Sequence, residues 1–211
     1  MKKNASKSGP KLLQHDQHFL DQGFKSLAGV DEAGRGPLAG PVVASAVIVR
    51  DFLFSSDIND SKKMTPKARE IAYEEILEKS VVGIGVIDSP LIDEINIFEA
   101  TMRAMQEALT RLGEIPDCVL IDGPKAPKLP FKQIPIINGD AVSFSIACAS
   151  VVAKVTRDRI MKYYDRIYPE YGFGRHKGYG TQEHVEALKK HGPCKIHRRS
   201  FEPVKSLCKL F

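Results

Sequence analysis

The sequence predicts an α/β fold, a mixed sheet flanked by helices, and three observations support this class. Two apolar, strand-like runs come first, helices and strands then alternate, and the last third is mostly helical. The chain has 211 residues, of which 43% are hydrophobic, so it can bury one substantial core. We therefore expect a polar N-terminal arm over 1–25 and one domain over 26–211, which ends in a helical extension over about 170–211.

The first half of the domain is predicted to contain two adjacent strands, a helix, a third strand and a second helix. The first segment has two apolar runs joined by a Gly- and Pro-rich turn, which is typical of neighbouring strands. Thr65 followed by Pro66 predicts the start of the first helix, and apolar residues at helical spacing predict the second. These segments cover 26–49, 65–80, 81–87 and 93–112.

The second half is predicted to contain two short strands and then two helices. Small residues in the first of these helices would permit close packing, and Pro169 ends it. Thr181 can cap the last helix, and Gly192 is a natural stop. The segments cover 117–122, 133–138, 143–168 and 182–191.

Three separate apolar runs of the predicted strands end in acidic residues. Asp31 and Glu32 follow LAGV, Asp122 follows CVLI, and Asp140 follows IPIIN and a glycine. If these strands are neighbours in the sheet, their ends can converge on one edge and bring four carboxylates together. Such a group repels itself and is favourable mainly when divalent cations lie among the carboxylates.

The candidate ligand atoms are all oxygens, and none of the four cysteines or six histidines is spaced to join them. Hard ions, Mg²⁺ or Mn²⁺, are therefore expected, and zinc is disfavoured. Two such ions about 3.5 to 4 Å apart can activate a water and stabilise the leaving oxygen in phosphodiester hydrolysis. The pattern thus predicts a two-metal hydrolase whose catalytic and metal-binding residues are Asp31, Glu32, Asp122 and Asp140.

Each acid taken alone has a simpler interpretation, because an Asp after a strand is commonly a turn or helix-cap residue. The pair Asp31–Glu32 is harder to explain in this way, since burying it without a partner would be costly. A non-catalytic module that binds nucleic acid is an alternative that the basic residues alone would also fit. The acids distinguish the two classes.

A dinucleotide-binding enzyme is a further alternative, since Gly34, Gly36 and Gly40 follow a predicted strand. The spacing is G-x-G-x-x-x-G, however, and Pro37 lies inside it. A second strand follows where this class requires a helix. The glycine pattern therefore argues against a nicotinamide-dependent enzyme.

Charge is distributed unevenly along the chain. Residues 154–211 contain 14 Lys and Arg against 6 Asp and Glu, a net charge of +8, which leaves −3 for residues 1–153. A basic C-terminal third is expected in a protein that contacts a phosphate backbone, although a solvated helical face explains it equally well.

Targeting and redox signals are few. The four cysteines are scattered and form no C-x-x-C pair, so neither a disulfide framework nor a zinc site is indicated. No apolar run is long enough for a membrane span, and no signal peptide is apparent. We expect a soluble cytoplasmic monomer that does not bind membranes.

The sequence resembles the prokaryotic ribonuclease HII family along most of its length. The first match, GVDEAGRGPLAGPVVASAV at 29–47, is similar to the opening signature of that family. Further matches follow in chain order: NDSKKMTPKARE (59–70), NIFEATMRAM (96–105), VLIDG (119–123), NGD (138–140), ASVVAKVTRDRIM (149–161), HKGYGTQEH (176–184) and HRRSFEP (197–203).

The resemblance implies a ribonuclease H-like fold and an endoribonuclease that uses two divalent ions, Mn²⁺ or Mg²⁺. It implies cleavage of the RNA strand of RNA/DNA hybrids, and cleavage 5′ of single ribonucleotides embedded in duplex DNA to leave a 5′-phosphate. The acidic quartet of the family falls on the four acids already singled out. The positions that match the segment recognising a ribonucleotide next to DNA are Gly34, Arg35, Gly36 and Tyr179.

The chain departs from the family pattern at Asn138, where many members carry Lys. A cation that could buffer the carboxylates is therefore expected to be missing. Ser61 and Lys62 are candidate contacts to backbone phosphate, with a helix-capping turn as the alternative.

Further basic residues are candidate duplex or phosphate contacts, each with a solvated or packed side chain as its alternative: Lys154, Arg157, Arg159, His176, Lys177, His197, Arg198 and Arg199. The C-terminal SLCKLF has an apolar end that could bind a sliding clamp, although packing on the core of the chain itself is favoured.

Overall fold

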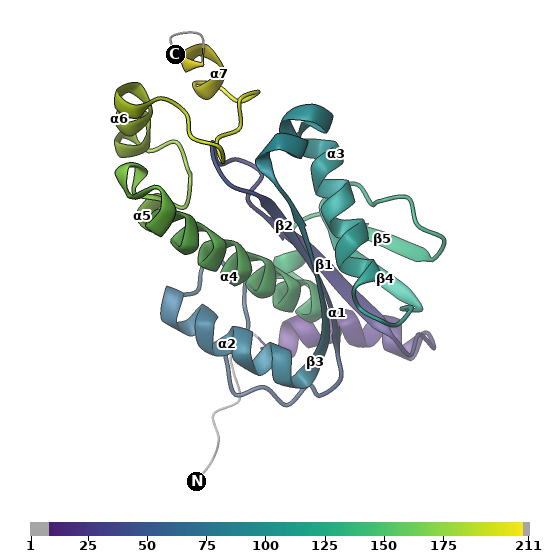
Figure 1. The fold of residues 1–211 in the computed structure, drawn as a ribbon. Helices are drawn as coiled ribbons and strands as arrows, with labels where there is room; N and C mark the ends of the chain where they lie inside the picture. The colour runs from purple at the N-terminus through teal and green to yellow at the C-terminus, as the bar shows by residue number, and fades with distance from the viewer. Residues whose placement is uncertain (1–8, 209–211) are drawn as a thin grey trace.

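The computed structural model describes residues 9–208, and its centre is one five-stranded sheet (Figure 1). The strand order is β3-β2-β1-β4-β5. β1 pairs antiparallel with β2 and β2 with β3, whereas β1 with β4 and β4 with β5 are parallel. The mixed sheet is therefore confirmed. Its strands are β1 (Leu27–Ala33), β2 (Val42–Val49), β3 (Ser80–Ile87), β4 (Cys118–Asp122) and β5 (Lys132–Ile136).

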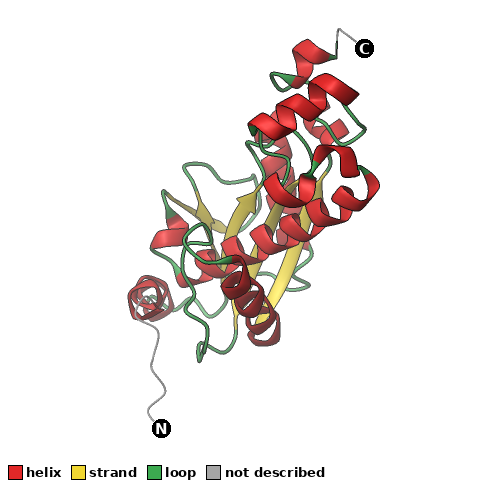
Figure 2. Cartoon of the chain, turned by 90° about the vertical axis from the view of Figure 1, so that its left-hand side faces the viewer, coloured by secondary structure: helices red, strands yellow, loops and turns green. Residues whose placement is uncertain are grey.

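Helices cover both faces of the sheet and extend beyond one end of it. In Figure 1, α1, α2 and α4 lie on one face, α3 lies on the other, and α5, α6 and α7 continue past the sheet. Figure 2 shows the same C-terminal helices at the opposite end of the molecule from α1. The bounds are α1 (Gly9–Asp21), α2 (Pro66–Lys79), α3 (Ser89–Thr110), η1 (Gly139–Ala141), α4 (Phe144–Ile167), η2 (Pro169–Tyr171), α5 (Phe173–His176), α6 (Gln182–His191) and α7 (Val204–Leu207).

Glycines in the strands let the helices approach the sheet closely. A Cβ atom on Gly29 of β1 would lie 2.1 Å from the backbone of Ser145 in α4. A Cβ atom on Gly83 or Gly85 of β3 would lie 2.0 Å from a carbonyl oxygen of α3. Without a side chain at these positions the backbones come into contact. As a result α4 packs directly over β1, the strand that carries the first two acids.

The observed helix α3 differs from the predicted helix 93–112. It begins at Ser89 after the N-cap Asp88, and it is broken at Asn96, whose φ of 66° and ψ of 164° are not helical. The Asn96 side chain accepts hydrogen bonds from the amides of Phe98 (2.9 Å) and Glu99 (3.1 Å), so it caps the second part of the helix. The earlier start follows from Pro90, which favours the first turn of a helix.

The predicted N-terminal arm contains a helix that packs on the domain. Leu12 of α1 is buried, and the carboxylate of Asp16, 1% exposed, accepts a hydrogen bond of 2.7 Å from the Ser145 amide at the start of α4. The first eight residues of the arm lie outside the described residues. At the other end, Val204 is buried and residues 209–211 lie outside the described residues. Within the part that is described, no helix has the length and apolar character to cross a membrane.

Candidate active site

The four predicted acids lie at one edge of the sheet, which we call the acidic edge. β1 and β4 are parallel neighbours with Val30 opposite Ile121, so Asp31 and Asp122 follow at the same level. Side chains alternate along a strand, which directs Asp31 toward α4 and Glu32 toward the α3 face. Asp140 lies in η1, which follows β5.

Asp31 is held in place by its own strand and by α4. Its carboxylate accepts a hydrogen bond of 2.7 Å from the Glu32 amide and a second from the Ser150 hydroxyl. The Ser150 hydroxyl lies 2.8 Å from that of Ser61, which is 3% exposed. The Ser61 side chain therefore faces the interior and Ser150, not solvent. The sequence does not single out Ser150, because it is one of several small residues in a helix. Only the fold places it next to Asp31 of β1.

Asp122 and Asp140 are joined by a tight turn. The Gly139 amide donates a hydrogen bond of 2.6 Å to Oδ1 of Asp122. Asn138 has the left-handed conformation, with φ of 55°, that Asn tolerates better than most residues. A Cβ atom on Gly139 would lie 2.6 Å from Cδ1 of Ile146 and 3.3 Å from Oδ1 of Asp122, so a side chain there would crowd both. This turn carries Asp140 back to the strand that ends in Asp122.

Two cationic side chains contact the acidic edge. Nζ of Lys62 lies 3.4 Å from Oδ2 of Asp140, and Nη1 of Arg35 lies 3.2 Å from Oε1 of Glu32. The expectation that Asn138 leaves the carboxylates without a nearby cation is therefore wrong. Lys62 supplies that charge from the loop before α2, a part of the chain far from Asn138 in sequence. Its ammonium is mostly exposed, so it can move away from Asp140.

Burial and mutual repulsion raise the pKa values of three of the acids. Burial raises the pKa of Asp31 well above its usual value, and the charges of Glu32 and Asp122 raise it further. The pKa of Glu32 is raised by burial and by Asp122, although Arg35 offsets part of this. The pKa of Asp122 is raised by burial and by Asp140, against the Gly139 hydrogen bond. Each effect would be relieved by a cation among the carboxylates.

The acids form a linked series in which neighbours interact, not a closed cage. Among residues 9–208, no group of three or more His, Cys, Asp and Glu side chains is gathered so that it could hold a metal ion. Alternation along β1 explains this, because Glu32 leaves the strand on the opposite side from Asp31. The donors are nevertheless all carboxylate oxygens, and the pKa values of Asp31, Glu32 and Asp122 are raised, which fits a site for hard divalent cations.

The glycine loop over 34–36 lies beside the acidic edge. Arg35 and Gly36 are exposed, and a Cβ atom on Gly36 would lie 4.0 Å from the Tyr179 ring. Tyr179 itself is 46% exposed. Gly34 has φ of 98°, and a Cβ atom on it would lie 2.0 Å from the Arg157 side chain, so this position requires glycine. Of the predicted recognition residues, Arg35, Gly36 and Tyr179 thus share one surface, whereas Gly34 is buried beneath it.

Two buried arginines fix the backbone of this loop, and we call them the carbonyl clamp. Arg198, 0% exposed, donates hydrogen bonds to the carbonyl oxygens of Gly34, Arg35 and Gly40. Arg157, 1% exposed, donates to the carbonyl oxygens of Ala39, Pro41 and Lys177 at 2.9 to 3.1 Å. In a trans peptide the N–H points away from the C=O. The clamp therefore turns the amides of Arg35 and Gly36 away from itself.

Several basic residues that the sequence offered as phosphate contacts have other roles. Arg157, His197 and Arg198 are buried, so the interpretation of these three as duplex contacts is wrong. Arg159 forms ion pairs with Glu70 and Glu74. Charge counts could not reveal this, because burial of an arginine depends on carbonyl groups that other segments supply.

Three histidines, His176, His184 and His197, pack together next to the carbonyl clamp. Nε2 of His184 lies 2.9 Å from Nε2 of His197, and the His176 ring stacks on that of His184 at 4.5 Å. Nδ1 of His184 lies 2.9 Å from the Tyr179 carbonyl oxygen. Burial lowers the pKa of His184 to about 4 and that of His197 to about 3, so both rings are neutral at pH 7. His176 is likewise a packed histidine.

The strand order and the carboxylates at one sheet edge define the class of ribonuclease H-like proteins. A family model described as Ribonuclease HII matches residues 28–204. Ribonuclease HII of Ruminiclostridium cellulolyticum is 54% identical over 192 residues, which cover 90% of this chain and 75% of the relative. The chain therefore belongs to the ribonuclease HII family and is a ribonuclease H enzyme.

Two solved structures share the fold. One is the PCNA:RNase HII complex from Archaeoglobus fulgidus, with a TM-score of 0.72, 24% identity, and coverage of 84% of this chain and 95% of that chain. The other is Bst-RNase HIII in complex with Mn²⁺, with a TM-score of 0.67, 16% identity, and coverage of 88% and 70%. At these identities the likeness shows the fold. Family membership and the β2 strand after the glycine loop exclude a dinucleotide-binding enzyme.

Proposed function

We propose that this ribonuclease H cleaves the RNA strand of RNA/DNA hybrids and cuts on the 5′ side of single ribonucleotides embedded in duplex DNA. The observation that carries the proposal is the position of the acidic edge beside the 34–36 loop. Asp31 and Glu32 belong to the same strand that leads into Gly34, so ligands and recognition loop are fixed relative to each other. The reaction would leave a 5′-phosphate, and its cellular use would be ribonucleotide excision.

The metal ligands would be Asp31, Glu32, Asp122 and Asp140, which would hold two divalent ions, Mn²⁺ or Mg²⁺. When bound, such ions activate water and stabilise the leaving oxygen of a phosphodiester. The chain's own part is placement, since Ser150 and the Gly139 amide fix two of the carboxylates. Lys62 would leave Asp140 and turn to the phosphate backbone, and its exposure permits this.

Recognition of the ribonucleotide would come from the loop and from Tyr179. The exposed amides of Arg35 and Gly36 can approach a 2′-hydroxyl, the group that distinguishes RNA from DNA. The Tyr179 ring can stack on the adjoining deoxyribose or base. Because its ring is half exposed, Tyr179→Ala should lower cleavage at single ribonucleotides more than cleavage of long hybrids, without unfolding the chain. Tyr163→Ala, at a similarly exposed tyrosine, is the matched control.

Partners beyond the nucleic acid are proposed more narrowly. A sliding clamp could bind the C-terminus, and the complex of the Archaeoglobus relative with PCNA supports this. In this chain Val204 is buried, while Leu207 and Cys208 pack against the same cluster, so the apolar residues in the described part of the SLCKLF segment contact the chain itself. The end of this segment, residues 209–211, lies outside the described residues. The monomeric state, the cytoplasmic location and the domain boundaries stay predictions.

The test is cleavage of end-labelled duplexes that contain either one ribonucleotide or an all-RNA strand. Each duplex is incubated with Mg²⁺, Mn²⁺ or EDTA. Wild type should cut both with a metal and neither with EDTA, whereas Asp122→Asn should bind both but cut neither. Asp21→Asn, an exposed acid on α1, is the control that should cut normally. Cleavage by Asp122→Asn at the wild-type rate would refute the metal assignment. Binding without cleavage by wild type would favour the alternative, a non-catalytic module that binds RNA/DNA hybrids.

A further inference from the structure

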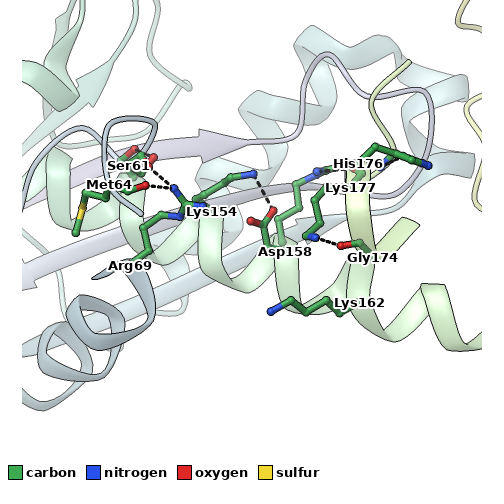
Figure 3. A network of polar contacts seen from close by, with 12 residues as sticks. Ser61, Met64, Arg69, Lys154, Asp158, Lys162, Gly174, His176 and Lys177 are labelled. Carbon is green, nitrogen blue, oxygen red and sulfur yellow. Dashed lines mark hydrogen bonds and ion pairs between the residues drawn. The ribbon is translucent and has the colours of Figure 1, made fainter. Parts of the chain in front are cut away.

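A second concave site lies on the far side of Tyr179 from the acidic edge, between α2, α4 and the segment after α5. It is a cavity of about 340 Å³. Figure 3 shows its lysines side by side, two from α4 and one from the chain after α5. We call it the lysine groove, and its cationic lining residues are Arg69, Lys154, Lys162, Arg175 and Lys177. Glu70 and Asp158 are the acids among its lining residues, so positive charge predominates.

Three of the five cations are held by an acid within the groove's surroundings or by two carbonyl oxygens. Lys154 donates to Asp158 at 2.8 Å, as the dashed line in Figure 3 marks. Arg175 pairs with Glu183. Arg69 donates to the carbonyl oxygens of Ser61 and Met64 at 2.7 and 2.6 Å. These contacts leave Lys162 and Lys177 as the groove's available charges.

Lys162 and Lys177 are held less closely than the other three cations. The Lys162 ammonium lies 4.0 Å from Oε1 of Glu70, and the Lys162 side chain is 59% exposed. Within residues 9–208, the hydrogen bond of the Lys177 ammonium is to the Gly174 carbonyl oxygen. Burial lowers the pKa of Lys177, and the charges of Lys162 and Lys154 add to this against the opposing charges of Asp158 and Asp165. Lysines held close to each other are favourable when an anion lies among them, the inverse of the acidic edge.

Lys177 is also held rigidly at this position. Its backbone is in the left-handed region, with φ of 54°, and its carbonyl oxygen accepts a hydrogen bond of 3.0 Å from Arg157. Arg157 is half of the carbonyl clamp, so the same guanidinium positions Lys177 and the segment that follows the glycine loop. A charge fixed in this way loses little conformational freedom when it binds a ligand.

The lysine groove and the acidic edge are connected at two places. Tyr179 lines the groove and also adjoins Gly36 of the recognition loop. On the other side, Arg69 holds the carbonyl of Ser61, the residue before Lys62, which contacts Asp140. A strand that crosses the acidic edge would therefore bring its own continuation, or the strand paired with it, over the groove.

We propose that the lysine groove binds the phosphodiester backbone of the duplex away from the cleavage site, with Lys162 and Lys177 as its phosphate contacts. The proposal rests on the proposed function for the duplex itself. Lysine ammonium groups suit this ligand because they bind phosphate as point charges. Unlike the planar guanidinium of arginine, they do not depend on a bidentate geometry. The phosphates belong either to the cut strand beyond the ribonucleotide or to the uncut strand.

The first test measures how binding depends on salt. Affinity for an RNA/DNA hybrid is measured in EDTA, so that no strand is cut, across a range of salt concentrations. Each lost phosphate contact lowers the slope of log Kd against log salt by about 1. The double variant Lys162→Gln/Lys177→Gln should therefore lose about 2 from the slope, and Lys162→Arg/Lys177→Arg should keep it.

The control for charge is Lys189→Gln/Lys190→Gln, which removes two exposed lysines from α6 in the same basic third of the chain. It changes the net charge equally and should leave the slope near that of wild type. If the groove variant and this control lost the same amount, or if neither lost any, the groove would not be a phosphate site. Thermal melting of each variant checks that the fold is intact, and the arginine variant keeps the test valid if Gln at 177 disturbs the turn.

The second test locates the strand. Single neutral methylphosphonate linkages are placed at successive positions in either strand. At the contacted linkage, neutralisation should weaken binding by wild type but not by the Lys162→Gln/Lys177→Gln variant. The strand that contains this linkage shows whether the groove binds the cut strand or the uncut strand. If neither strand contains such a linkage, the proposal is overturned. Cleavage by wild type in Mn²⁺ is measured in parallel. Normal cleavage with no groove effect refutes this inference alone, while absent cleavage refutes the proposed function.

Discussion

The acidic edge and the carbonyl clamp both bury like charges, but the charges are neutralised in different ways. At the acidic edge, Asp31 lies beside Glu32 and Asp122, and burial with mutual repulsion raises all three pKa values. In the clamp, burial lowers the pKa of Arg157 to about 10 and that of Arg198 to about 9, where Arg157 adds to the effect. The clamp is satisfied by backbone carbonyl oxygens, whereas the acidic edge keeps carboxylate oxygens for an outside cation.

The difference shows when a buried group of like charges indicates a ligand. A guanidinium has five N–H donors, and peptide carbonyls from nearby loops can satisfy them without any charged partner. A carboxylate has only acceptors, and the amide and hydroxyl donors near Asp31 and Asp122 reach only part of their lone pairs. The acidic edge is therefore incomplete in the chain alone, and the carbonyl clamp is complete.

The largest expected effect is on activity at the acidic edge. Asp31→Asn should lower kcat by well over 100-fold, because partners that only orient metal ligands are worth about 10- to 100-fold. The same change should raise the melting temperature without metal, since it removes one buried negative charge. Each pKa unit by which Asp31 is raised corresponds to about 1.4 kcal/mol.

Cleavage assays and metal-free melting curves for Asp31→Asn check these two effects. A fall in both activity and metal-free stability would mean that Asp31 stabilises the fold and is not primarily a metal ligand. The exposed acid variant Asp21→Asn should change neither quantity.

In the carbonyl clamp, by contrast, substitution of a buried charge should lower the stability of the fold. Arg198→Lys leaves a single ammonium to serve the carbonyls of Gly34, Arg35 and Gly40. Each buried carbonyl left without a donor costs about 1 to 3 kcal/mol, so the free energy of unfolding should fall by about 2 to 5 kcal/mol. Urea unfolding measures this loss. Arg199→Lys, the exposed neighbour, is the control, and an equal effect of the two changes would show that Arg198 does not hold the loop.

Lowering the pH should change the free energy of unfolding in opposite directions through the buried histidines next to the clamp and through Asp31. His184 and His197 stay neutral in the fold but become protonated in the unfolded chain, so their stabilising effect is complete above pH 6.5 and is lost as the pH falls toward 4. The slope is up to about 1.4 kcal/mol per pH unit for each ring. The raised pKa of Asp31 acts oppositely, because the folded chain then binds more protons.

Unfolding free energies between pH 7 and 4 test this opposition. The loss of stability with falling pH should be steeper for Asp31→Asn than for wild type and shallower for His197→Gln. His18→Gln, an exposed histidine on α1, is the control. Parallel curves for all four proteins would contradict the assignment of the buried rings.

The smallest expected effect is that of metal on stability. A divalent ion at ten times its Kd stabilises the fold by about 1.4 kcal/mol, which for a chain of this size raises the melting temperature by roughly 3 to 6 °C. Mn²⁺ or Mg²⁺ should produce this shift in wild type and not in Asp122→Asn. Arg199→Lys, which leaves the four acids of the acidic edge unchanged, should respond to metal as wild type does. A shift that persists in Asp122→Asn would place the cation elsewhere.

The predicted elements agree with the structure where local patterns decide them. The pairs of Thr and Pro at 65–66 and of Thr and Gln at 181–182 begin α2 and α6 as predicted, because an N-cap is a local interaction. The α3 helix begins at Ser89, four residues before the predicted start, because Asp88 caps it and Pro90 favours its first turn. The short helices α5 and α7 have too few residues to give a periodic signal.

The sequence by itself determined the family, the strands that end in Asp31, Glu32 and Asp122, and the glycines of the recognition loop. Each of these is written in consecutive residues and follows from chain geometry. Only the tertiary structure decided which side chains support them. The contact from Lys62 to Asp140 spans 78 positions in the chain, and the bond from Arg198 to Arg35 spans 163. Such contacts depend on which segments the sheet and α4 bring together, and no local pattern encodes that.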